Sequence, residues 1–192
     1  MKAIICTEYG PPTVLKVGEV EKPVPRKNQI CIRVIASAVT ASDSRVRGFD
    51  FPMTNPMIVM FRLILGLSRP RNPVLGMVMS GVVDSVGKNV RKYKPGDHVF
   101  GMTGPGFGSY AEYNCVSQNA CFVHKPEQLT HEEAAAITYG GLLASDCLRR
   151  GKINDCRRIL VYGASGAIGT SAVQLAKAAG VYVVAVCSGK NR

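Results

Sequence analysis

One stretch near the end of the chain constrains the fold more than any other. An apolar run, Ile159–Tyr162, leads into a turn with three glycines, an amphipathic helical stretch follows, and a second apolar run covers Tyr182–Cys187. This order predicts one strand–helix–strand unit of about 30 residues, the length expected of a mononucleotide-binding half. The pattern favours an α/β fold with a parallel sheet in this region.

The glycines of this turn have the spacing that a dinucleotide-binding turn needs. One glycine permits a tight turn, one lets the backbone approach a pyrophosphate, and one allows close helix–strand packing. The helix that begins near Gly166 would offer N–H groups and the positive end of its dipole to an anion. The alternative is a tightly packed turn that binds no ligand. The residues expected to contact the cofactor are Gly163, Ala164, Ser165, Gly166, Ala167, Ile168 and Gly169.

The chain stops at Arg192, shortly after the second predicted strand. A sheet of this kind usually has about six strands, and only two are expected here. Because uncovered apolar strand edges promote association, we expect a truncated cofactor domain that belongs to a longer protein.

The first part of the chain has a different pattern. Short runs rich in β-branched residues, separated by glycine and proline turns, predict a small barrel-like domain. From Thr130 onward, an acidic first turn and an alanine-rich stretch predict a helix to Arg150. We expect two domains, residues 1–125 and residues 126–192. The expected strands of the first domain are Ala3–Thr7, Leu15–Val20, Gln29–Ala36, Gly81–Val86, His98–Phe100 and Ser109–Cys115.

Charge and composition restrict the partners. The formal charge of +11 would suit nucleic acid, but the basic residues are scattered and tryptophan is absent. An anionic cofactor explains the positive charge as well as nucleic acid does, together with the loss of an acidic C-terminal portion that would balance it. The most membrane-like segment, Met57–Leu67, is far shorter than about 20 residues and carries Arg62, so we expect a packed helix or lid and no membrane partner. Seven cysteines without a Cys-x-x-Cys spacing favour a reducing, cytoplasmic location. The sequence does not decide whether the protein forms a homodimer.

Motifs along the whole chain resemble those of the medium-chain dehydrogenase/reductase superfamily. The resemblance implies a GroES-like β-barrel domain that carries substrate and catalytic residues. It is followed by a Rossmann cofactor domain, of which this chain would hold the first strand–helix–strand unit. Within the superfamily, the sequence is most similar to the zinc-free quinone oxidoreductase branch. The motifs are Gly10–Pro12, Val39–Asp43, Leu75–Gly76, Pro95–Gly101, Gly108–Tyr113, Glu133–Ile137 and Gly163–Gly169.

The residues at the family's metal positions are not zinc ligands. The resemblance places Thr40 where zinc-dependent members have a cysteine, Gly76–Val78 in place of Gly-His-Glu, and Thr138–Tyr139 near a later cysteine. Zinc needs thiolate, imidazole or carboxylate ligands, which these side chains do not supply. We therefore expect no metal. The histidines, better explained as surface or strand residues, are His98, His124 and His131.

Without a Lewis acid, the substrate must already be electron-poor, as a quinone or an enone is. The resemblance implies that Thr40 faces the nicotinamide and that Ser42 contacts the substrate oxygen. Tyr139 would line the cleft, with a core tyrosine as the alternative. For Ser42 and Asp43, the alternative is the N-cap of a short helix over Ser44–Gly48.

The end of the second strand predicts the cofactor. An acidic residue about 20 residues past the glycines selects NAD by hydrogen-bonding the ribose 2′-OH, and none follows Val186. Ser188, Lys190 and Arg192 supply a hydroxyl and cations that suit the 2′-phosphate of NADPH. A solvated basic loop is the alternative.

Together these features predict an NADPH-dependent oxidoreductase that transfers a hydride to small quinone-like or enone acceptors without zinc. The second hypothesis is a truncated, non-catalytic binding or interaction fragment of such an enzyme.

Overall fold

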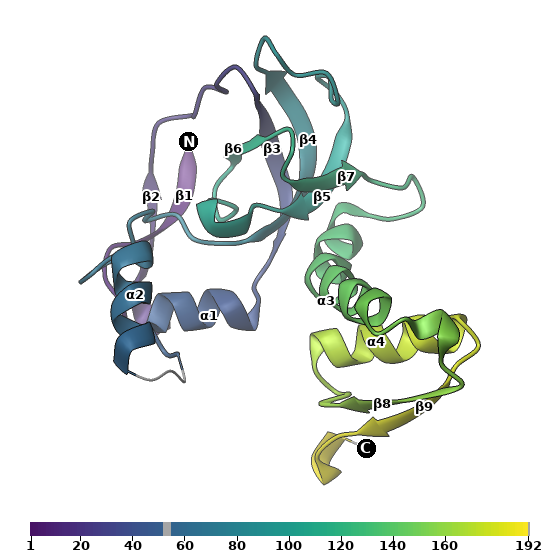
Figure 1. Ribbon diagram of the computed structural model, residues 1–192. Coiled ribbons are helices and arrows are strands. Elements are labelled where there is room, and N and C mark those ends of the chain that lie inside the picture. Colours follow the sequence, from purple (N-terminus) through teal and green to yellow (C-terminus); the bar gives the residue numbers. More distant parts are fainter. Residues whose placement is uncertain (52–54, 192) are drawn as a thin grey trace. The chain divides into compact units, whose positions relative to one another are not determined.

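The computed structural model describes residues 1–51 and 55–191. The chain divides into two compact units, Met1–Ala135 and Ala136–Arg192 (Figure 1). This division falls inside the long helix α3, His131–Arg150. The domain boundary expected between residues 125 and 126 stays a prediction.

An antiparallel sheet of five strands forms the centre of the first unit, in the order β6-β3-β4-β5-β7. A separate hairpin pairs β1 with β2, and single bridges join Ala3 to Ala111 and Ile5 to Val74. These bridges fasten the hairpin to the loops around the sheet. The strands are β1 Lys2–Cys6, β2 Leu15–Glu19, β3 Gln29–Ala38, β4 Val78–Val86, β5 His98–Met102, β6 Tyr113–Ser117 and β7 Cys121–His124.

Three of these strands differ most from the sequence prediction, and the others agree within two residues at each end. β4 begins earlier than the expected Gly81, and β6 begins later than the expected Ser109. Gly108 has a φ of +98°, outside the strand region, and its N–H donates to the carbonyl of Leu75 (3.2 Å). Residues 108–112 therefore form a loop. β7 was not predicted, because four residues with mostly exposed side chains carry too little pattern.

The side chains on the inner face of the sheet build the main core of the first unit. A second cluster lies between the hairpin and the helices, around Cys6, Val46, Leu75 and Phe107. Each fully buried aliphatic side chain stabilises the fold by roughly 1.5–3 kcal/mol. The main core consists of Ile30, Ile32, Met79, Val83, Val90, Val99, Val116 and Phe122.

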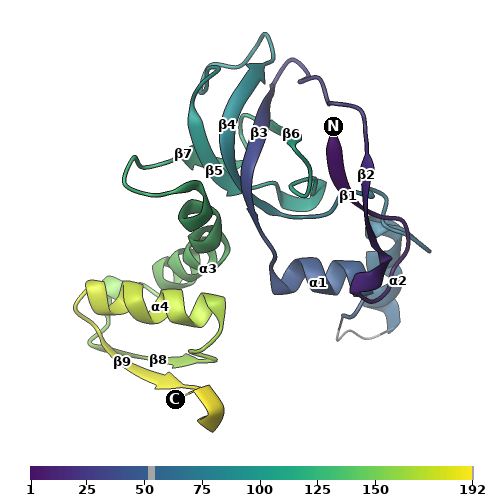
Figure 2. The ribbon, with the colours of Figure 1, turned by 180° about the vertical axis from the view of Figure 1, so that it is seen from behind.

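Two helices follow β3 at one end of the sheet: α1 Ala41–Gly48 and α2 Asn55–Leu65 (Figures 1 and 2). α2 occupies the segment expected to form a packed helix or lid. Its one charged residue, Arg62, stacks over the ring of Phe49 at 4.4 Å. In the part of the chain that the structure describes, no helix is long and apolar enough to cross a membrane.

The second unit confirms the expected strand–helix–strand order. β8, Arg158–Tyr162, pairs in parallel with β9, Tyr182–Val186, and α4, Ala167–Ala178, packs on one face of the pair. α3 packs against the start of α4 so closely that a Cβ on Gly140 would lie 2.3 Å from the carbonyl oxygen of Ala167. Short 3-10 segments lie at Pro12–Val14, Gly104–Gly106, Ile153–Asp155 and Gly189–Asn191.

The first turn of α3 is joined to the sheet through a histidine. Thr130 and Glu133 form the expected capping interaction, each accepting the other's backbone N–H. His131 Nδ1 lies 2.7 Å from the hydroxyl of Ser80, a fully buried residue of β4. Its Nε2 lies 3.0 Å from Nδ1 of His98, at the start of β5. The imidazole of His131 therefore links α3 to two strands.

We predict that mild acid weakens this junction. Burial, then the charges of His98 and Lys125, lower the pKa of His131. The unfolded chain, in which a histidine has a pKa of about 6.5, therefore binds a proton that the folded chain resists. The free energy of unfolding should fall as the pH drops below about 6.5, and His131→Gln should remove this part of the fall. Denaturant unfolding at a series of pH values measures both.

The matched control is His124→Gln, because His124 lies outside the junction and its pair with Asp97 (3.2 Å) is at the surface, where such a pair contributes little. This variant should lose stability in acid as the unchanged protein does. An equal acid loss in the His131→Gln protein would show that the junction does not titrate.

Candidate functional site

The turn between β8 and α4 contains three glycines with different structural roles: Gly163, Gly166 and Gly169. Gly163 has a φ of +78°, which glycine adopts without strain. A Cβ on Gly169 would lie 2.2 Å from the carbonyl oxygen of Gly163, so α4 packs on the turn only with glycine there. A Cβ on Gly166 would come no closer than 3.5 Å to its neighbours, which is ordinary contact. Packing within the chain therefore does not require glycine at 166, whereas a ligand that approaches the backbone would.

The N-terminus of α4 suits an anion. Gly166 is the N-cap, makes no side-chain capping bond, and no acidic residue occupies the first turn. The N–H groups of the first turn thus have no side-chain acceptor, and the helix dipole adds positive potential. Ser165, Ala167 and Ile168 are exposed beside them, and Ala164 is buried. This turn fits the pyrophosphate of a dinucleotide.

The loop after β9 lies beside the glycine turn. The N–H groups of Gly163 and Ala164 both donate to the carbonyl of Val186, at 2.9 and 3.0 Å. Asn191 Nδ2 donates to the hydroxyl of Ser165 at 3.1 Å. Ser188 and Lys190 are exposed in the same loop. The structure therefore brings these two predicted residues next to the predicted phosphate site.

Arg192, the remaining residue predicted to bind the cofactor, lies outside the described residues.

Thr40 and Asp43 hold the start of α1. The Asp43 carboxylate accepts the N–H of Thr40 (2.8 Å) and its hydroxyl (2.7 Å) through Oδ2, and the hydroxyl accepts the N–H of Asp43 (3.3 Å). This reciprocal pair is a capping box. The helix expected over Ser44–Gly48 begins earlier, at Ala41. Thr40 is therefore the N-cap and Ser42 lies within the first turn. The alternative that placed the cap at Ser42 or Asp43 was wrong in position, although Asp43 takes part in the capping box.

Ser42 and Tyr139 are both half-buried. Ser42 follows the cap of α1 in the first unit, and Tyr139 lies in the part of α3 that belongs to the second unit. Each takes part in an interaction within the protein. Their roles toward a substrate stay predictions.

The positions compared with zinc enzymes carry no ligand set. Met77 is half-buried and Val78 is a fully buried residue of β4. Across residues 1–51 and 55–191, no three His, Cys, Asp or Glu side chains gather as metal ligands. Of the histidines, His124 pairs with Asp97 at 3.2 Å, and the other two join each other at the start of α3.

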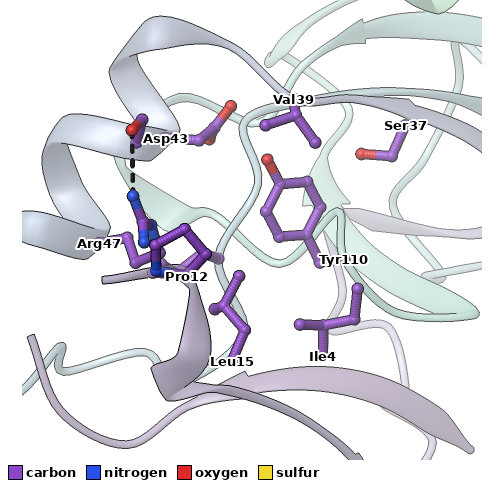
Figure 3. Close-up of a pocket in the computed structure, with 10 residues that line it drawn as sticks. Ile4, Pro12, Leu15, Ser37, Val39, Asp43, Arg47 and Tyr110 are labelled. Carbon is purple, nitrogen blue, oxygen red and sulfur yellow. Dashed lines mark hydrogen bonds between the residues drawn. The ribbon is translucent and has the colours of Figure 1, made fainter. Parts of the chain in front are cut away.

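The first unit also contains a pocket of about 450 Å³ beside α1 (Figure 3). Its walls include Leu15, Val39 and Leu75, and its polar residues include Arg47 and Tyr110. Sequence reasoning did not select Arg47 or Tyr110. One usable signal was present, since Arg47 follows Asp43 by one helical turn and residues at that spacing share a face of the helix.

Comparison with known proteins gives the class of this chain. Residues 26–127 match the alcohol dehydrogenase GroES-like domain. The chain is 32% identical over 191 residues to the quinone oxidoreductase of Sus scrofa, covering 96% of this chain and 52% of that protein. It is 35% identical over 202 residues to the mitochondrial NAD(P)H oxidoreductase RTN4IP1 of Bos taurus, covering 98% and 49%.

Solved structures agree. The quinone oxidoreductase from Coxiella burnetii superposes with a TM-score of 0.82 at 32% identity, over 100% of this chain and 57% of that one. The Escherichia coli quinone oxidoreductase, solved in complex with NADPH, gives 0.80 at 25% identity, over 100% and 54%.

The chain belongs to the medium-chain dehydrogenase/reductase superfamily, which confirms the expected α/β fold class with a GroES-like N-terminal domain. It spans about half the length of the curated relatives that it matches.

We predict that Thr40 stabilises the fold through its capping role. Thr40→Ala removes the N-cap hydroxyl and should lower the free energy of unfolding by about 0.5–2 kcal/mol. Ser42→Ala, two residues further on in the same first turn, is the matched control, because alanine is the better helix former there, and it should cost less. Chemical denaturation of both variants compares the two losses. Equal losses would mean that the cap does not hold α1.

Proposed function

We propose that this chain binds NADPH and serves a reductase that transfers a hydride to small quinone-like or enone acceptors without zinc. The observation that carries the proposal is the glycine turn. Gly166 leaves room for a ligand at an uncapped helix N-terminus, next to a loop that carries Lys190 and no acidic residue. When bound, the nicotinamide supplies the hydride. The names of the relatives support quinones as acceptors.

In this proposal, residues of the chain bind and orient the two reactants. The turn from Gly163 to Gly169 holds the pyrophosphate, and Ser188, Lys190 and Arg192 hold the 2′-phosphate. Ser42 would contact the oxygen of the acceptor, and Tyr139 would line the cleft that receives it. Thr40 would face the nicotinamide, with its hydroxyl oriented by the Asp43 carboxylate (2.7 Å).

Zinc independence is part of the same proposal. Hydroxyl and thioether groups at Thr40 and Met77, with an aliphatic side chain at Val78, do not bind zinc. Hydride transfer to an acceptor that is already electron-poor does not need a Lewis acid. The seven cysteines all carry free thiols, which supports a reducing compartment such as the cytoplasm.

The second candidate is a non-catalytic binding fragment. One observation favours it, since the chain spans about half the length of its relatives. Titration with NADPH, followed by heat or nucleotide fluorescence, separates the candidates.

We expect the 192-residue chain to bind NADPH with a dissociation constant in about the micromolar range, near 8 kcal/mol of binding free energy. Addition of 1,4-naphthoquinone should then consume NADPH, and a chelator should not slow the reaction. No binding at millimolar NADPH would favour the fragment instead. Binding without turnover would keep the cofactor site and refute the reductase activity of this chain.

Cofactor choice tests the basic loop. We predict that NADPH binds at least about tenfold more tightly than NADH, because a cation and a hydroxyl favour the 2′-phosphate. Lys190→Ala should erase most of the difference. The matched control is Lys177→Ala, since Lys177 is an exposed lysine at the other end of α4, and it should leave the preference unchanged. Equal affinity for both cofactors in the unchanged protein would refute the assignment.

A further inference from the structure

Two cysteines face each other across neighbouring strands of the five-stranded sheet. Cys31 of β3 is the register partner of Cys115 of β6. Ile30 and Ile32, on either side of Cys31, belong to the main core, and so does Val116 beside Cys115. Because successive side chains of a strand point to opposite faces, both thiols lie on the face of the sheet turned away from that core.

The hydrogen bonds between β3 and β6 show which kind of pair these cysteines form. The N–H of Val34 donates to the carbonyl of Glu112, and the N–H of Gln118 donates to the carbonyl of Asn28. Hydrogen-bonded pairs therefore recur at every second residue between these two positions, and the cysteine pair falls between two of them. In such a non-hydrogen-bonded pair the Cα atoms are about 4.5 Å apart and the side chains are closer than in the other kind.

This arrangement suits a disulfide, which joins residues whose Cα atoms are about 4.4–6.8 Å apart. The side chains of Cys31 and Cys115 are already hydrogen-bonded to each other. Each sulfur lies 3.7 Å from the carbonyl oxygen of Pro23. Both thiols are free. A bond between the two sulfur atoms therefore needs little movement of either strand.

The two thiols differ in acidity and in exposure. The hydrogen bond that Cys115 donates lowers the pKa of Cys31, and the charge of Lys22 acts in the same direction, against burial and Asp84. The pKa of Cys115 is raised, first by this hydrogen bond and then by burial. Cys31 is fully buried, whereas Cys115 is half-buried. An oxidant from solvent therefore meets Cys115, and Cys31 is the base beside it.

We propose that Cys31 and Cys115 are a redox modification site, at which a peroxide converts the two thiols into a reversible disulfide. This inference does not rest on the proposed function, because neither cofactor nor acceptor takes part. In a reducing compartment the pair would stay open until an oxidant arrives. The bond would tie β6, which lies at the edge of the sheet, to β3.

The reaction consumes two thiols and one hydrogen peroxide, and it yields the disulfide and two molecules of water. Once Cys31 has ionised, Cys115 passes its proton to Cys31 and attacks one oxygen of the peroxide. The O–O bond breaks, Cys115 becomes a sulfenic acid, and the hydroxide that leaves takes the proton of Cys31. The Cys31 thiolate then attacks the sulfenic sulfur, and the second hydroxide leaves with a proton from solvent.

The first experiment maps the bond. The purified chain is reduced with dithiothreitol, freed of the reductant and treated with a slight excess of hydrogen peroxide at low protein concentration. The remaining thiols are alkylated, and tandem mass spectrometry of a digest identifies the linked peptides. We expect a link between Cys31 and Cys115 in most molecules, which dithiothreitol removes. Unreacted thiols, sulfur acids in place of the link, or a link between other cysteines would overturn the proposal.

The second experiment measures the effect of the bond on thermal unfolding. The disulfide restricts the unfolded chain over a loop that spans most of the first unit. Peroxide should therefore raise the Tm of the unchanged protein by about 5–15 °C, and dithiothreitol should reverse the rise. No rise, or a fall, would show that the bond does not fit the folded chain and would also overturn the proposal.

Two variants assign this rise to the pair. Cys115→Ser should abolish it. Cys121→Ser is the matched control, because it removes an exposed thiol of β7 that lies outside the pair, and it should keep the rise. An equal rise in Cys115→Ser would assign the stabilisation to another oxidation. The mapped link in the unchanged protein tests the proposal even if Cys115→Ser does not fold.

Discussion

The buried carboxylate of Asp43 holds the passage from β3 into α1 in the first unit. One oxygen closes the capping box with Thr40, so β3 passes directly into α1 with its first turn satisfied. The carboxylate also interacts with the buried Tyr110 hydroxyl, whose pKa is raised first by burial and then by Asp43. A charged group is buried only where its partners repay the lost hydration. The N–H and hydroxyl of Thr40 supply part of that compensation inside the protein.

The second unit depends on a steric constraint instead of a charge. Gly169 lets the first turn of α4 lie against the carbonyl of Gly163, closer than any side chain allows. That contact sets the direction of the helix relative to the end of β8, and the bonds to the carbonyl of Val186 fix the turn to the end of β9. The N–H groups of the helix and the loop with Lys190 consequently meet at one place. The position of this proposed anion site follows from glycine packing more than from any specific side chain.

The sequence predicted these features unequally, for physical reasons. The strand–helix–strand unit and α3 were predicted well, because their signals are local: apolar runs, glycine spacing and the Thr130 capping residue. β7 was missed and β6 was placed too early, because hydrogen bonds to distant residues decide where those strands begin. The pocket was not foreseen at all. Tyr110 and Asp43 are far apart in the sequence, and only the folding of the hairpin, α1 and the loop before β6 brings them together.

Thr40 shows why the position of a residue in a family motif does not fully define its role. The resemblance assigns it to the nicotinamide, yet its hydroxyl donates to Asp43 and accepts from the Asp43 N–H. These roles are compatible, because a hydroxyl has two acceptor lone pairs and only one is used by the cap. The cap fixes where the oxygen points, and a fixed oxygen can orient a ligand without losing side-chain entropy on binding. In this fold, the Thr40 hydroxyl that caps α1 is therefore also the group that would face the cofactor.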